Sequence, residues 1–307
     1  MASHIIGFIP LFDVYSQGYP FLEAIYSHLM VCDDIYILDA SKDSTTKILQ
    51  LLKNNRIHIY HTKLELQGNK NGEIINKMAN TALNMVRNEV KRGQNYVFYF
   101  QANEIIHQDS YKFFRSVLKR YPNYNNYLLY YYELFGHYLF GEQFRLRLVR
   151  LTNVTHVIGD GWALDNPIVN FNYVKSLFYH NFNTIITKHK FSDGFYNIYN
   201  KYRFVYSPHP VYRYSRIFPY NTMLKLKVHK ILFQNSYFSE IKPLVKYKST
   251  DEFFKKLCKL ESTKAKYNRR EFPGCQKILD HPKIMQEILD KPKYFVRPEI
   301  INLINKL

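Results

Sequence analysis

Short apolar runs alternate with amphipathic stretches over the first half of the chain. The apolar runs have the length of buried strands and occupy residues 5–10, 34–38, 56–61 and 96–100. Apolar side chains at helical spacing follow Pro20, and the longest amphipathic stretch runs over residues 71–92, before Gly93. Shorter helices are predicted after two pairs of capping residues, Asp43 or Ser44 and Asp109 or Ser110. Strands that alternate with helices predict an α/β fold, with a mostly parallel mixed sheet flanked by helices.

The pattern changes twice in the second half. Alternation of apolar and polar residues predicts an antiparallel extension of the sheet, with strands at 127–132, 144–149, 155–158 and 176–180. After about Tyr220 the sequence is basic and helical. We therefore predict a domain over residues 1–219, with halves at about 1–107 and 108–219, and a basic helical region over residues 220–307.

Polar residues follow two of the predicted strands. One group is Asp39 to Asp43, and the other is Gln101 to Glu104. Because parallel strands end at the same edge of a sheet, both groups are expected at one edge, where α/β proteins bind ligands. A structural interpretation stays open, in which Asp39 and Asp43 cap a helix and Glu104 is solvated in a loop.

The chain is strongly basic, with 43 Lys and Arg against 25 Asp and Glu and a net charge of +18. Such a surface attracts phosphates, nucleic acid or anionic lipid headgroups. No nucleic-acid-binding motif accompanies the charge, so nucleic acid is the less favoured partner. The denser basic C-terminal third leaves peripheral membrane contact as an open alternative.

Three cysteines, Cys32, Cys258 and Cys275, have no metal-type spacing and no disulfide framework is expected from their odd number. The N-terminal residues lack a charged, cleavable leader, and no stretch reaches the roughly 18 apolar residues of a spanning helix. These features predict a cytoplasmic protein.

Four motifs resemble the family 2 glycosyltransferases of the GT-A type, in particular a branch whose strand-end motif reads Gln-Ala-Asp-Glu. They are residues 19–25 (YPFLEAI), 37–45 (ILDASKDST), 98–107 (FYFQANEIIH) and 145–150 (RLRLVR). Their order and spacing match over roughly residues 5 to 182. The resemblance implies a GT-A fold and transfer of a sugar from a nucleotide-sugar donor.

The resemblance also assigns residues to the donor. It implies that the base and ribose lie near Pro10, Asp39 and Asp43, and the diphosphate near Asn103 and Glu104, with Gln101 also binding the donor. Arg145 and Arg147 alternate with leucines, so both guanidinium groups are expected on one strand face. They would reach the diphosphate there, and a role in surface ion pairs is an equal alternative.

The strand-end motif binds the metal ion in this family, and here it departs from the family pattern. Asn103 stands where the family usually has Asp, and Gln101 stands at an earlier position that is usually acidic. An amide oxygen binds Mg²⁺ or Mn²⁺ without contributing charge. Three outcomes stay open: a weakened site formed by Glu104, Asn103 and His180; metal-independent transfer in which Lys or Arg neutralises the diphosphate; or lost activity.

An inverting transfer needs a carboxylate base, and Asp160 and Asp165 are the candidates. Trp162 lies between them in a Gly-flanked loop and is expected to stack on the acceptor sugar. The sequence thus predicts a glycosyltransferase that acts on a glycan, lipid-linked or protein acceptor. An inactive GT-A-like protein that binds sugar or nucleotide is the alternative.

Overall fold

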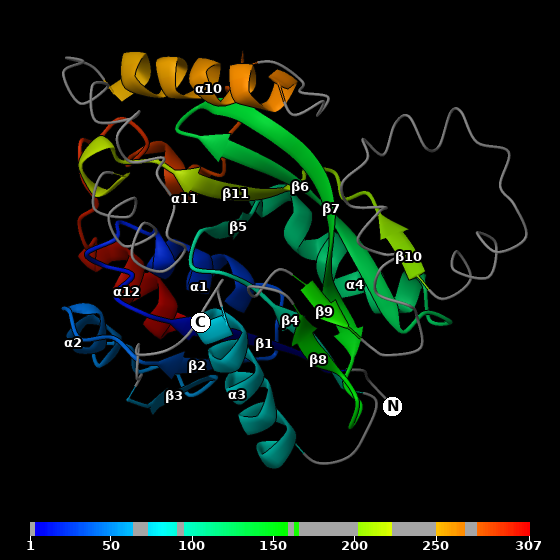
Figure 1. Cartoon of the computed structure of the whole chain (residues 1–307). Helices are drawn as coiled ribbons and strands as arrows, with labels where there is room; N and C mark the ends of the chain where they lie inside the picture. Colours follow the sequence, from blue (N-terminus) through cyan, green and yellow to red (C-terminus); the bar gives the residue numbers. More distant parts are fainter. Residues whose placement is uncertain are drawn as a thin grey trace, which may run out of the picture.

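A ten-stranded mixed β-sheet, with a separate two-stranded sheet of β8 and β9, organises the described part of the chain in the computed structural model (Figure 1). The structure describes residues 4–63, 73–90, 95–158, 163–165, 202–222, 250–267 and 275–307. The strands within these residues are β1 His4–Leu11, β2 Asp34–Asp39, β3 Ile57–His61, β4 Asn95–Tyr99, β5 Glu104–Ile106, β6 Asn126–Phe135, β7 Tyr138–Arg150, β8 His156–Ile158, β9 Ala163–Asp165, β10 Tyr202–Val205, β11 Val211–Arg216 and β12 Gln276–Lys277. The helices are α1 Phe21–Leu29, α2 Thr45–Leu49, α3 Glu73–Glu89, the 3-10 helix η1 Gln108–Ser110, α4 Tyr111–Arg120, α10 Thr250–Tyr267, α11 Lys283–Gln286 and α12 Pro298–Lys306.

The strands follow the order β3-β2-β1-β4-β7-β6-β11-β5, with β10 beside β6 and β12 beside β7. β1 pairs in parallel with β2 and β4, and β7 runs antiparallel to both β4 and β6. β11 is parallel to β6, so β1, β2, β4, β6 and β11 all end at one edge. We call this edge the carboxyl edge.

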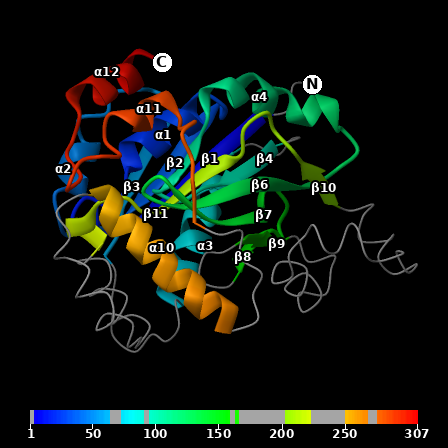
Figure 2. The same cartoon turned by 90° about the horizontal axis from the view of Figure 1, so that it is seen from above.

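Helices cover both faces of the sheet (Figure 2). Ile5 and Ile9 of β1 pack in the core that contains α1, α4 and α12, whereas Ile6 and Phe8 pack in the core beneath α3. This alternation follows from the two-residue period of a strand, which sends successive side chains to opposite faces. The predicted α/β fold class with helices on both sides of a mixed sheet is confirmed.

Most predicted elements lie within a few residues of their observed bounds. The predicted strand at 176–180 lies outside the described residues. Pro20, which precedes the apolar residues of the first predicted helix, occupies the cap position just before Phe21. Among the described residues, no helix is both long and apolar enough to cross a membrane. The division into residues 1–219 and 220–307 stays a prediction.

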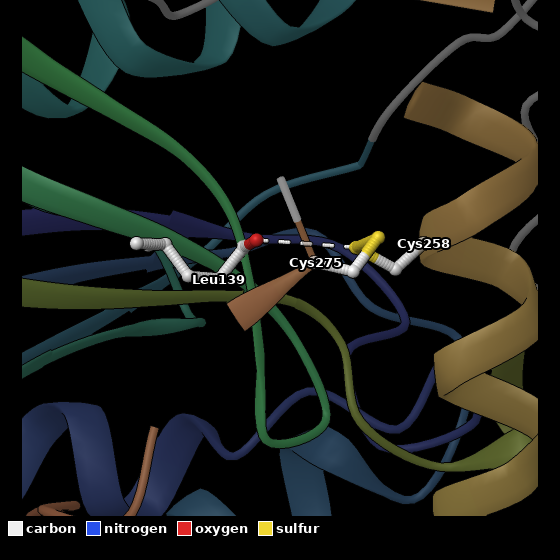
Figure 3. Close-up of a disulfide and its surroundings, with 3 residues drawn as sticks. All are labelled: Leu139, Cys258 and Cys275. Atoms are coloured by element: carbon white, nitrogen blue, oxygen red, sulfur yellow. Dashed lines mark hydrogen bonds between the residues drawn. A yellow bond between two sulfur atoms is a disulfide. The ribbon is translucent and has the colours of Figure 1, made fainter. Parts of the chain in front are cut away.

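A disulfide between Cys258 and Cys275 corrects the expectation of unpaired cysteines (Figure 3). Cys258 lies on α10, and Cys275 directly precedes β12, which pairs with β7. Both sulfurs lie near the backbone of Leu139 on β7 in Figure 3. The odd cysteine, Cys32, is buried and free. Sequence spacing alone did not reveal that β7 brings the other two together.

Loss of this disulfide should destabilise the fold. The bond spans a sequence separation of 17 residues, and closing a loop of about that length stabilises by about 3 kcal/mol. Urea unfolding of the double variant Cys258→Ser/Cys275→Ser should show a decrease of that size. Dithiothreitol should reproduce the decrease in the wild type and have no further effect on the variant. An identical unfolding curve for the oxidised and reduced wild type would contradict the assignment.

Candidate functional site

Six charged side chains gather at and below the carboxyl edge, where β4, β6 and β11 end and β7 passes between β4 and β6. We call them the arginine cluster, and its members are Glu104, Glu133, Arg145, Arg147, Arg213 and Arg216. Four guanidinium groups face two carboxylates, so the cluster carries an excess of positive charge. An anionic ligand is therefore the complementary partner for this edge.

Glu104 forms the buried centre of the cluster. Its Oε1 lies 2.7 Å from Arg147 Nη2 and 3.8 Å from Arg145 Nη1. All three side chains are at least 97% buried. Burial raises the pKa of Glu104, but Arg147, Arg145 and Arg213 outweigh it and hold the pKa below its ordinary value. Glu104 is therefore an ionised carboxylate enclosed by arginines.

The outer part of the cluster is more accessible. Arg213 is 20% exposed and contacts Glu133, and its Nη2 lies 3.4 Å from Gln101 Oε1. Ser215 Oγ donates to the same Glu133 carboxylate at 2.6 Å. Arg216, the last residue of β11, is half-buried and lies over the Phe135 ring. Arg213 and Arg216 are the arginines of the cluster that a ligand at this edge would reach first.

A small pocket has Arg216 among its lining residues. The connection after β1 and the end of β11 supply its lining residues, among them Gln17, Tyr19 and Asn221. Gly18 has a φ of +68°, and a Cβ atom there would overlap the Asn221 side chain. Glycine is therefore required for the connection to approach Asn221, because it tolerates positive φ and has no side chain.

Asp39 and Asp43 lie at the carboxyl edge as predicted, but protein groups surround their carboxylates. Asp39 is buried, and its Oδ2 accepts a hydrogen bond from Thr46 Oγ1 at 2.6 Å. Asp43 accepts hydrogen bonds from the backbone N–H groups of Thr45 and Ser16. These bonds stabilise the start of α2 and its contact with the connection after β1. Ser44 occupies the cap position of α2 without a side-chain cap hydrogen bond, so the two aspartates hold the segment before the helix rather than cap it, and donor binding by both stays a prediction.

The other predicted donor residues occupy different environments. Pro10 is a half-buried residue of β1 opposite Leu38. Asn103 is buried, donates from Nδ2 to the Tyr214 carbonyl at 3.1 Å, and so fixes β5 against β11. Gln101 reaches Arg213, and Arg145 and Arg147 are enclosed beside Glu104. A diphosphate therefore cannot contact Arg147 without rearrangement of the cluster.

The predicted metal ligands do not fit a divalent cation as they lie. Arg145, Arg147 and Arg213 each place a nitrogen within 3.9 Å of Glu104 Oε1. A dication at that oxygen would meet three guanidinium groups, and the repulsion between like charges is strong inside a protein. His180, the third predicted ligand, lies outside the described residues. We therefore derive no metal-dependent step from Glu104 and Asn103.

The predicted acceptor residues are only partly placed. Asp160 and Trp162 lie outside the described residues. Asp165 ends β9, and its backbone pairs with His156 of β8. Two asparagines of α3, Asn76 and Asn80, bond to the Val157 backbone and hold this hairpin over the sheet. The catalytic roles of Asp160 and Asp165 and the stacking role of Trp162 stay predictions.

Sequence reasoning missed Arg213, Arg216 and Glu133. The segment 211–216 reads VYRYSR, in which Arg213 lies between two tyrosines much as Arg147 lies between two leucines. This local pattern was an available signal for Arg213, because it predicts a strand with a charged residue on one face. Arg216 stands three residues further on, beyond a bulge after Tyr214 that the pattern does not predict. What the alternation does not show is that β11 lies beside β6 and brings Arg213 to Glu133.

Glu133 should make stability depend on acid pH. Burial raises its pKa, but Arg213 and Arg145 outweigh that effect and lower the pKa to about 2, from an ordinary 4.5. Because the folded-state pKa is depressed, this contribution to stability is present above pH 4.5 and is lost as the pH falls towards 2. The slope of unfolding free energy against pH in that range should be shallower for Glu133→Gln. Parallel curves for variant and wild type would contradict this role.

Comparisons with known proteins find similarity among solved structures. No protein-family model matches the chain, and no curated protein matches it. The structure of S. aureus TarS is 15% identical over 43% of this chain and 22% of TarS, with a TM-score of 0.32. TarS 1–349 is 11% identical over 85% of this chain and 74% of that one, with a TM-score of 0.38.

The same TarS fragment in complex with UDP is 12% identical, over 80% of this chain and 75% of that one, with a TM-score of 0.38. The first two TarS structures found are matched over only 22% and 35% of their own length. At these identities and TM-scores the similarity carries no functional argument. The fold described above is established by the strand order and pairing of the chain itself.

Proposed function

We propose that the protein is a glycosyltransferase that uses a nucleotide-sugar donor. The observation that carries the proposal is the arginine cluster at the carboxyl edge, where Asp39 and Gln101 also lie after parallel strands. A nucleoside diphosphate is an anion that suits such an edge, and departure of the diphosphate is the step that needs positive charge. The four sequence motifs that resemble family 2 glycosyltransferases support the same assignment.

The reaction follows from this placement of charge. An acceptor hydroxyl oxygen attacks the anomeric carbon as the bond from that carbon to the diphosphate oxygen breaks. The electron pair of the broken bond stays on the diphosphate, and a carboxylate, Asp160 or Asp165, takes the hydroxyl proton. Arg213 and Arg216 stabilise the leaving diphosphate by charge-assisted hydrogen bonds, in place of a divalent cation. The acceptor is a glycan, a lipid-linked sugar or a protein.

Thermal unfolding with nucleotides tests donor binding and the role of Arg213. UDP, GDP, CMP and dTDP should be compared, each with and without Mn²⁺. One nucleotide at 100 times its dissociation constant should stabilise by about 2.7 kcal/mol, without a need for Mn²⁺. Arg213→Gln should remove most of this stabilisation, because it deletes the exposed cation at the diphosphate position.

Arg115→Gln is the matched control. It removes the same charge from α4, where Arg115 contacts Asp33 just before β2, at the edge of the sheet opposite the carboxyl edge. Nucleotide stabilisation should be unchanged in this variant. Equal loss in both variants would mean that net charge alone accounts for binding, and absence of any nucleotide response would overturn the proposal.

A second candidate, a nucleotide- or sugar-binding protein without turnover, is favoured by Gln101 and Asn103, which stand where the family motif is acidic. Both side chains are engaged by protein groups of β11. Donor hydrolysis or transfer to a panel of acceptors separates the two functions. Nucleotide stabilisation without any release of nucleoside diphosphate would support the binding protein. DNA binding with a steep dependence on salt concentration would instead favour a nucleic-acid-binding function over both.

A further inference from the structure

Two histidines and two aspartates converge beside η1, away from the arginine cluster. They are His107, His209, Asp109 and Asp280, and we call them the histidine–aspartate cluster. We propose that this cluster binds a transition-metal dication, with zinc as the best match. The proposal does not rest on the glycosyltransferase function.

Strand pairing brings the two histidines together. His107 follows β5 directly, and His209 stands two residues before β11. β5 and β11 are antiparallel, with Ile106 opposite Val211, so the two flanking segments meet. The imidazole rings stack with centroids 3.9 Å apart. Ser110 Oγ also bonds to the backbone N–H and carbonyl of His209, which fixes the segment before β11 against η1.

Asp109 lies at one edge of the stacked rings and completes a three-residue ligand set. Its Oδ2 is 3.6 Å from His107 Nδ1 and 3.7 Å from His209 Nε2. His107 Nδ1 accepts a hydrogen bond from the Asp109 backbone N–H at 3.3 Å, which a metal ion would displace. One ligand atom from each residue lies within 4.8 Å of the other two. Donor atoms around tetrahedral zinc, at bond lengths near 2.0–2.2 Å, are about 3.3 Å apart. Rotation of the His209 ring, which is 26% exposed, would bring its nitrogen to this spacing.

Asp280 lies at the opposite edge of the same rings. Its Oδ1 is 3.5 Å from His107 Nε2, and its Oδ2 is 3.2 Å from His209 Nδ1. These are the ring nitrogens that face away from Asp109. Histidines that bind metal commonly donate their other N–H group to a carboxylate, which orients the ring and increases its basicity. Asp280 is placed to do this for His107.

The charges of the cluster also suit a dication. With both imidazoles neutral, the two aspartates leave two negative charges, which one dication balances. Nitrogen donors from His with a carboxylate oxygen favour zinc and neighbouring transition metals, whereas Mg²⁺ and Ca²⁺ prefer oxygen donors alone. A bound metal would connect η1, the segment before β11 and, through Asp280, the segment between β12 and α11.

Titration calorimetry of untagged, chelator-treated protein with Zn²⁺ tests the proposal. One equivalent should bind, and Co²⁺ at the same site should give the visible absorption of a four-coordinate complex. Mg²⁺ should neither bind with comparable affinity nor raise the melting temperature. His209→Gln and Asp109→Asn should each weaken zinc binding by more than the roughly 10- to 100-fold that loss of an outer-shell partner costs. Asp280→Asn should fall within that range.

His58→Gln is the matched control. His58 of β3 has its Nε2 3.1 Å from Oδ1 of Asp34 on β2, a histidine–aspartate pair remote from the cluster. Zinc binding should be unchanged in this variant. No zinc binding by the wild type, or equal affinity in wild type, His209→Gln and Asp109→Asn, would overturn the proposal. Asp109 is 64% exposed and the change to Asn is nearly isosteric, so this variant gives a result even if His209→Gln does not fold.

Discussion

Replacement of Arg147 by methionine should lower the free energy of unfolding by about 3–5 kcal/mol, the typical cost of breaking a buried ion pair from one side. Arg147 Nη2 lies 2.7 Å from Glu104 Oε1, and neither side chain is accessible to water. The guanidinium group also lies 4.4 Å from the centre of the Tyr99 ring. Methionine fills much of the same volume, so the decrease in stability would come mainly from the buried Glu104 charge that is left without a partner. Urea unfolding of the variant and the wild type measures this decrease.

Glu104→Gln tests the same pair from the other side. It leaves Arg145, Arg147 and Arg213 facing one another without the central carboxylate, so a loss of similar size is expected. Combining the two substitutions should cost less than the sum of the single losses, because Glu104 and Arg147 are then both replaced and neither is left as an unpaired charge opposite the other. Lys256→Met is the control, since the exposed Lys256 and Glu252 pair on α10 is worth no more than about 0.5 kcal/mol. An Arg147 loss as small as the control would contradict the buried pair.

Arg297→Met should also destabilise the protein by about 3–5 kcal/mol, because it strands a second buried carboxylate. Glu23 of α1 is fully buried, and its Oε1 lies 2.9 Å from Arg297 Nη2. Tyr294 donates to the other oxygen of Glu23 at 3.1 Å. The C-terminal segment thus supplies both partners of a carboxylate in the first helix. Urea unfolding of the variant against the wild type measures the cost.

The outer partner of the same arginine provides the control. Arg297 Nη1 lies 3.0 Å from Glu287, whose side chain is 73% exposed. Glu287→Gln should cost at most about 1 kcal/mol, since exposed ion pairs contribute little. Similar losses for Arg297→Met and Glu287→Gln would mean that burial does not set the cost of the first. Glu23→Gln should resemble Arg297→Met.

The architecture of the sheet was predictable because it follows from the local periodicity of apolar residues along the chain. Strand length, helical spacing and glycine or proline stops over a few residues predict βαβ units, and the handedness of crossovers then places their ends at one edge. The prediction that Asp39 and Gln101 follow strands at the same edge is confirmed by the parallel pairing of β1 with β2 and β4.

The chemistry of the candidate site was not predictable in the same way. Glu104 was predicted as a metal ligand from its position after a strand, but its partner Arg147 stands 43 residues further along the chain. No local pattern indicates which distant cation reaches a given carboxylate. The pairing of β11 with β5 and β6, which brings in Arg213, is equally remote in sequence. The cysteine pair and the histidine–aspartate cluster depend on such non-local pairings too.

The contact between Glu23 and Arg297 can form only late in the synthesis of the chain. The two residues are separated by 274 positions in the chain, and α12 contributes Ile300 and Ile304 to the apolar core that contains α1. During synthesis from the N-terminus, α1 is made long before the segment that contains Arg297. Until that segment is made, the Glu23 side chain is solvated and has no arginine partner. Contacts this distant in sequence slow folding and prolong the exposure of apolar surface. We expect nascent chains that stop short of Tyr294 to be the form most readily captured by chaperones and cleaved by proteases.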